Sequence, residues 1–322
     1  MSSTVDSGGS PSHRDLGGRL TVFGVLIVMF GALTALVGIL SPLAAKLLAG
    51  PDTPAPDPRS VATAIVLYAM LGAGLIWAGI GSIQQRRWVR SIMLTLGWSW
   101  LLFGLMSFLM TLGMLDRILE AAQGNEPLPA EVTWIVKLVT VGLVVAFGVA
   151  LPAAVLVAYR DRDVLATCMA RHPQPDWSEH LPPTVLGLGV GWSATALLGL
   201  PMALQPAVPL FGGLLTGRAG TWSLLVASAL FALVAREVFR MRPSGWWGST
   251  ASMVLIGVST AWTFARVDLA EFLRAMHYPE EQVRMMAVSR SFLVGATVVL
   301  TLLSLVYMAS IRHHFAEPGA RD

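Results

Sequence analysis

The feature that most constrains this chain is a series of eight apolar runs, most of them long enough to cross a lipid bilayer. A spanning α-helix needs about 20 predominantly apolar residues. Because hydrocarbon offers no partner to backbone amides and carbonyls, such runs must be helical. The runs cover residues 20–40, 61–83, 92–115, 135–158, 184–204, 222–235, 246–264 and 292–311. The sixth run reaches adequate length only by continuing through Val238 and Phe239, with Arg236 extending towards the interface.

Composition supports a membrane protein over a soluble one. Hydrophobic residues make up 55% of the 322 residues and charged residues only 13%, whereas soluble proteins carry about 25% charged residues. We therefore expect an all-α integral membrane protein with about eight transmembrane helices. Residues 1–19, whose first part contains Ser, Gly and Pro, are expected to form a disordered cytoplasmic tail, and residues 313–322 a second tail.

The positions of the arginines predict the orientation. Basic residues concentrate in loops that remain in the cytoplasm. In an eight-helix arrangement, the basic loops all fall on the side of the two termini, and the opposite loops are acidic. The termini are therefore expected to be cytoplasmic. The basic residues are Arg86, Arg87, Arg90, Arg160, Arg162, Arg236, Arg240, Arg242 and Arg312; the acidic ones are Asp52, Asp57, Asp116, Glu120, Glu126, Glu131, Glu280 and Glu281.

Short motifs recur in the same order in the two halves of the chain. They predict two parallel four-helix repeats at residues 20–159 and 184–312, joined by a polar cytoplasmic linker at 160–183. The paired motifs are Trp88 with Ser91 and Trp246 with Ser249; Lys137 with Val141 and Gly142, and Arg290 with Val294 and Gly295; and a Pro-Leu pattern at Pro42, Leu43, Leu47, Leu48 and Gly50 and at Pro209, Leu210, Leu214, Leu215 and Gly217.

The two Pro-Leu segments are too short to span the membrane. Each could form an amphipathic helix in the interface or a re-entrant element. We favour the interfacial helix, because a re-entrant backbone needs a surrounding protein cavity to satisfy its hydrogen bonds.

The centres of the predicted spans contain no ionisable residue, and the nearest basic residues lie towards the span ends. Lys137 and Arg290 lie towards span ends, and Asp116 and Asp268 lie just outside two other spans. Anchoring in the interface, or an ion pair with an outer acid, is the expected role of the two cations. The alternative is contact with an anionic ligand or lipid headgroup.

The sequence carries no recognised catalytic or cofactor motif. It lacks a P-loop, G-x-S-x-G and H-E-x-x-H. Cys168 and His172 are four residues apart in the linker, which we interpret as a chance pair on a solvated loop. No metal, no cofactor and no nucleic-acid partner is expected.

Four tryptophans lie deep in predicted spans and form the sharpest candidate for a ligand site. Nearby Ser and Thr hydroxyls could satisfy the indole N–H groups, or the tryptophans could line a ligand cavity. The four residues are Trp98, Trp100, Trp192 and Trp262.

Three functions remain open. The leading hypothesis is a non-enzymatic scaffold, accessory or assembly subunit with a protein partner or as a homo-oligomer. The second is a permease for a neutral or amphiphilic solute, favoured by the parallel repeats. The third is a lipid-modifying enzyme, which would require Asp116, Asp268, Lys137 and Arg290 to converge. Preference for Arg over Lys, with abundant Ala, Gly and Leu, indicates a bacterial inner membrane.

Overall fold

The computed structural model describes residues 14–48, 57–123, 129–174, 177–278, 280, 283 and 288–316. The first half begins with three helices, α1 (Gly17–Leu48), α2 (Pro58–Ile83) and α3 (Arg87–Gln123). Its fourth span consists of α4 (Ala130–Val145), the π-helical turn η1 (Ala146–Ala150) and α5 (Leu151–Arg160). A short helix, α6 (Arg162–Arg171), lies in the linker. The second half contains α7 (Pro183–Met202), β1 (Ala207–Leu210), β2 (Gly213–Thr216), α8 (Gly217–Phe239), α9 (Pro243–Arg266), α10 (Leu269–Ala275), α12 (Arg290–Ile311) and the 3₁₀ turn η2 (Arg312–Phe315).

Seven of the described helices are long and apolar enough to cross a membrane, and there are eight if α9 and α10, which meet at 104°, are counted as one broken span. Proline occupies the first helical position of α2, α7 and α9, where its missing N–H costs nothing and its fixed φ suits a helix. The chain is thus a polytopic, essentially all-α membrane protein, as the apolar runs predict.

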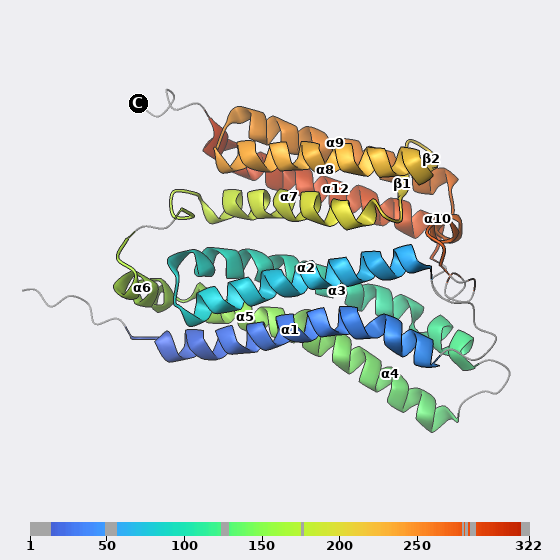
Figure 1. Ribbon diagram of the computed structural model, residues 1–322, viewed down its shortest axis with the longest axis horizontal. Coiled ribbons are helices and arrows are strands. Elements are labelled where there is room, and N and C mark those ends of the chain that lie inside the picture. Colours follow the sequence, from blue (N-terminus) through green and yellow to red (C-terminus); the bar gives the residue numbers. More distant parts are fainter. Residues whose placement is uncertain are drawn as a thin grey trace, which may run out of the picture.

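The helices form two groups that lie side by side (Figure 1). One group contains α1 to α5, and the other contains α7 to α12. The start of α1, the helix α6 and the end of α12 lie at one end of the bundle, whereas β1, β2 and α10 lie at the other (Figure 1). The start of the first spanning helix and the end of the last described one therefore lie at the same end of the bundle.

Glycines bring α1 and α2 into close contact. A Cβ on Gly24, Gly31, Gly72 or Gly79 would approach a backbone carbonyl of the opposing helix to 2.8 Å or less. In a membrane, helix association depends on such backbone proximity, because lipid tails are as apolar as the side chains. These glycines hold the first helical hairpin together.

The prediction of an interfacial helix is wrong for the second Pro-Leu segment. Pro209 and Leu210 belong to β1, Leu214 lies in β2, and the two strands pair antiparallel. Phe211 (φ 41°) and Gly212 (φ 90°) form the tip, and successive positive φ values match the right-handed twist of a tight hairpin. The turn residues, rather than the leucine spacing, therefore decide the structure of this segment.

The first Pro-Leu segment is structured differently. Pro42 lies inside α1, which continues to Leu48, and Gly50 lies outside the described residues. A helix that continues past Pro42 is neither a separate interfacial helix nor a match to the hairpin of the second half.

Candidate functional site

The first half and the linker meet in a cluster of polar groups, most of them buried, at the end of the bundle that holds the start of α1. We call Ser82, Arg87, Tyr159, Cys168 and Glu179 the junction. Tyr159 is fully buried and its hydroxyl lies 2.5 Å from the Ser82 hydroxyl, which donates to the Leu20 carbonyl at 2.9 Å. These bonds join α1, α2 and α5, and they satisfy two hydroxyls that would otherwise be costly to bury.

Arg87 connects the α2–α3 turn to the linker. Its side chain is 7% exposed and forms an ion pair with Glu179. It also donates to the carbonyls of Pro173 at 3.1 Å and His172 at 3.5 Å, and the His172 ring lies 2.9 Å from the Gln84 carbonyl. A guanidinium with several donors in a fixed plane suits such a multiple contact.

Helix α6 packs under the start of α1. The Leu16 amide donates to the Thr167 hydroxyl at 3.1 Å. Exposed ion pairs join Arg171 to Asp15 and Arg19 to Asp161. The linker, expected to be a polar connection, is therefore docked on the membrane domain.

The prediction that Cys168 lies on a solvated loop is wrong. The thiol is 1% exposed among apolar residues, and this burial raises its pKa from 9.0 to about 11, against a smaller opposing effect of Arg90. His172 turns away to Gln84. Since it belongs to the buried apolar cluster, Cys168 acts as a small packing residue.

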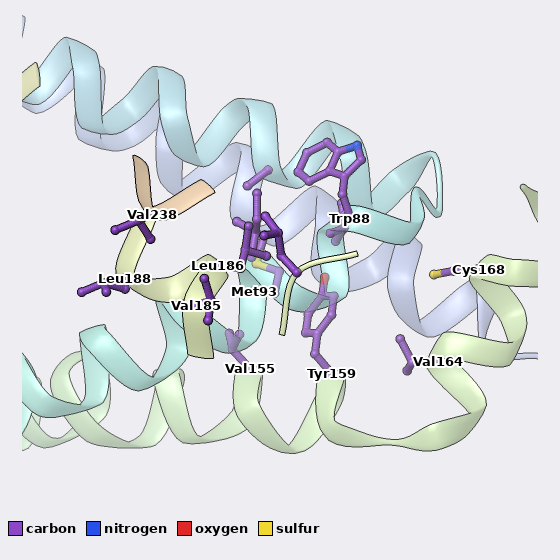
Figure 2. Packing of buried hydrophobic residues seen from close by; sticks show 14 of the residues in the cluster. Trp88, Met93, Val155, Tyr159, Val164, Cys168, Val185, Leu186, Leu188 and Val238 are labelled. Carbon is purple, nitrogen blue, oxygen red and sulfur yellow. The ribbon is translucent and has the colours of Figure 1, made fainter. Parts of the chain in front are cut away.

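An apolar cluster continues the junction into the second half (Figure 2). Val185 and Leu186 of α7 are fully buried and belong to the same cluster as Val155 and Tyr159 of α5. The cluster extends from Leu16, before α1, to Phe315, after α12. The core of the protein thus lies where both groups of helices and both ends of the membrane domain meet.

A second feature is an open groove between α1, α3 and the α4–η1 segment. Its volume is about 500 Å³. Trp100 forms one wall, where its ring stacks on Phe30 at 5.2 Å between centroids. The lining consists of Phe30, Trp100, Phe103, Gly104, Ser107, Leu143, Val144, Phe147 and Gly148.

The other three candidate tryptophans do not line this groove. Trp98 is 64% exposed. Trp262 is 50% exposed and carries the Arg266 guanidinium over its ring at 5.1 Å. Trp192 is buried against Phe231, and its indole N–H has no hydrogen-bond partner in the described part of the chain. Of the four, Trp100 is the one that lines this groove.

The candidate outer residues are brought together in one pair. Arg290 holds Asp268 through Nε at 3.1 Å and Nη2 at 2.7 Å, and both groups are exposed. Lys137 is half-buried on α4, in the other group of helices. Asp116 lies in α3, but its side chain is outside the described residues. Among described residues, no three His, Cys, Asp or Glu side chains gather as a metal site.

Two features were missed by sequence reasoning: the π-helical turn and the hairpin. Pro152 marks the first, because a proline ring clashes with the carbonyl four residues earlier, here that of Gly148. The pair Gly212 and Gly213 marks the second. Compared with protein-family models, curated proteins and solved structures, the chain matches none of them.

Proposed function

We propose that this protein is a non-catalytic scaffold, accessory or assembly subunit of a bacterial inner membrane. The observation that carries the proposal is the buried apolar cluster, because it joins Tyr159 of α5 in the first half to Val185 and Leu186 of α7 in the second. A permease that alternates between open states needs its halves to rock against each other. A scaffold needs them to stay in place.

Contacts at the opposite end of the bundle support the same proposal. The Thr63 hydroxyl, 6% exposed near the start of α2, donates to the Pro201 carbonyl of α7 at 3.2 Å. The halves are therefore joined near both membrane surfaces. Rocking would separate Val185 and Leu186 from α5 at one end and expose apolar surface. At the other end it would break Thr63–Pro201 and leave a poorly solvated hydroxyl without its partner.

The proposal includes cytoplasmic termini and a duplicated four-helix unit. Both are supported by the arginine-rich turns that lead into α3 and α9, each with a Trp-x-x-Ser motif. Orientation is tested in a Cys168→Ala background with an impermeant maleimide applied to intact spheroplasts. We expect labelling of Phe211→Cys, which replaces an exposed residue of the hairpin tip, and none of Arg86→Cys until the membrane is opened. The reverse pattern would invert the topology.

The test of function is extraction from native membranes in lipid-retaining polymer discs, followed by mass spectrometry of proteins, lipids and metabolites. A stoichiometric protein partner, or a defined homo-oligomer, is expected. A monomeric particle that carries a specific solute would contradict the proposal and favour the permease.

Rigidity is tested independently by spin labels at Arg86→Cys and Arg240→Cys, which place one label on the exposed basic turn of each half. A scaffold gives one narrow distance distribution in discs, whereas two populations would indicate rocking halves. Arg87→Ala serves as the comparison, since it should broaden the distribution.

A further inference from the structure

The groove between α1, α3 and η1 lies inside the hydrocarbon region. Phe30 follows Arg19 by 11 residues of α1, which is about 17 Å along the helix axis. Phe147 precedes Arg160 by 13 residues, or about 20 Å. Both depths fall within a hydrocarbon layer of about 30 Å. Any occupant must therefore be an apolar group that is available in the middle of the bilayer.

The shape of the groove follows from the π-helical turn. Pro152 cannot donate to the Gly148 carbonyl, and the Leu151 amide instead donates to Ala146, one residue further back than in an α-helix. The turn crosses α3 at Gly104, and there is no space for a Cβ on Gly104. From this crossing α4 diverges from the other helices (Figure 1). Phe103 and Phe147, 75% and 50% exposed, flank the opening.

The dimensions favour a lipid chain over a helix. The lining of α3 extends from Trp100 to Ser107, about 10 Å along its axis. A partner helix would require a seam along much of the 30 Å layer, built on small residues. The groove has a volume of about 500 Å³ and is open along one side, so an occupant keeps part of its surface against the surrounding lipid. Flat aromatic faces suit a flexible hydrocarbon chain.

We propose that this groove is a binding site for one hydrocarbon chain of a membrane lipid, which lies along the rings of Trp100, Phe30 and Phe147 beside the π-helical turn. This lipid site does not depend on the proposed scaffold function of the protein. π-Helical turns are frequent at functional sites, where the extra residue changes the direction of neighbouring side chains. Here the turn creates the divergence that a lipid chain fills.

The test places the photoreactive residue p-benzoylphenylalanine at Phe103, in protein reconstituted into vesicles of phosphatidylethanolamine and phosphatidylglycerol. After illumination, mass spectrometry identifies what has become attached. We expect adducts with the mass of a phospholipid, at a yield well above that from the same probe at Leu105. Leu105 is a matched control because it is 47% exposed on the same helix but does not line the groove.

A second substitution fills the groove. Ser107→Phe should reduce the Phe103 adduct to the level of the Leu105 control. Leu112→Phe, at a 50% exposed position of α3 outside the lining, should leave it unchanged. Equal yields at both probe positions, unaffected by Ser107→Phe, would mean contact with bulk lipid only and would overturn the proposal. So would an adduct with another protein chain, because it would place a helix in the groove.

If Ser107→Phe does not fold, fluorescence replaces it. Phospholipids brominated midway along the acyl chain quench nearby indoles, and the emission lost in Trp100→Phe isolates the contribution of Trp100. The emission of Trp98 is isolated in the same way with Trp98→Phe, and this residue is 64% exposed outside the groove. We expect the emission of Trp100 to be quenched more strongly than that of Trp98. Equal or weaker quenching of Trp100 would overturn the proposal.

Discussion

Gly104 and Gly148 face each other where α3 crosses the π-helical turn, and a Cβ on Gly104 would overlap the Gly148 carbonyl. A Cβ on Gly148 would in turn lie 3.1 Å from the Gly104 Cα. The backbones are in contact here, as they are between α1 and α2, and the groove opens beside this crossing.

Gly104→Ala should strongly destabilise the protein. The added methyl group has no space, and overpacking costs about 1–3 kcal/mol or more. Reversible unfolding in mixed detergent micelles measures the change. The control is Gly142→Ala, where a Cβ meets nothing within 4 Å; it should be neutral, or stabilising by up to about 1 kcal/mol. Equal effects of the two substitutions would refute close contact at the crossing.

Arg87→Ala should loosen the linker from the α2–α3 turn. The substitution removes the contacts that Arg87 makes with Glu179 and with two carbonyls. Removing one partner of a buried pair costs up to about 3–5 kcal/mol, and less here because Glu179 is 27% exposed. Arg86→Ala, at an exposed neighbouring site, should change stability by no more than about 0.5 kcal/mol. The same unfolding measurement compares them, and Arg87→Lys should restore little because it lacks the planar set of donors.

The hairpin tip should depend on two hydroxyls of α9. Thr263 accepts from the Gly212 amide at 3.1 Å, and Ser259 accepts from the Phe211 amide at the same distance. Thr263→Val keeps the shape of the side chain but leaves an amide unpaired, at a cost of about 1–3 kcal/mol. Hydrogen exchange should accelerate at Gly212. Thr250→Val removes only a bond to its own helix, and it should leave the hairpin protected.

Cys168 should resist alkylation and contribute to alkaline sensitivity. Its pKa of about 11 lies above the ordinary 9.0 because of burial, so the folded protein retains a proton that the unfolded chain releases. This contribution to stability is present below pH 9 and is lost as pH rises towards 11. Cys168→Ala should lack this part of the alkaline decrease in stability. The control is Met169→Cys in the Cys168→Ala background, because Met169 is 45% exposed on the same helix. Maleimide should react far more slowly with Cys168 in the unaltered protein than with the cysteine introduced by Met169→Cys.

The positions of the spanning helices could be predicted because each needs a long apolar run, and every predicted run lies within, or largely overlaps, a helical segment. Which face of a helix packs against protein could not be predicted. Leucine and tryptophan are as well accommodated by lipid as by a protein core. Trp98 and Trp192 come from similar apolar contexts, yet one is 64% exposed and the other 6%.

The groove and the hairpin illustrate two different reasons for a missed prediction. Gly212 and Gly213 were visible as turn residues, but the likeness of the segment to that around Pro42 favoured a helix. Pro152 was visible too, but its effect depends on Gly104, which is 48 residues away in the sequence. A hollow that needs both partners cannot be read from either one.

Leu16 and Phe315 belong to one apolar cluster, although one precedes the first spanning helix and the other follows the last. During synthesis the first half leaves the ribosome long before η2 does. The apolar residues that the first half contributes to the cluster therefore stay exposed until η2 packs against them. The cluster is therefore fully buried only after the helices from α1 to α12 have been inserted. A chain that stops short of η2 would keep an apolar surface open to the proteases and chaperones that remove unfinished proteins.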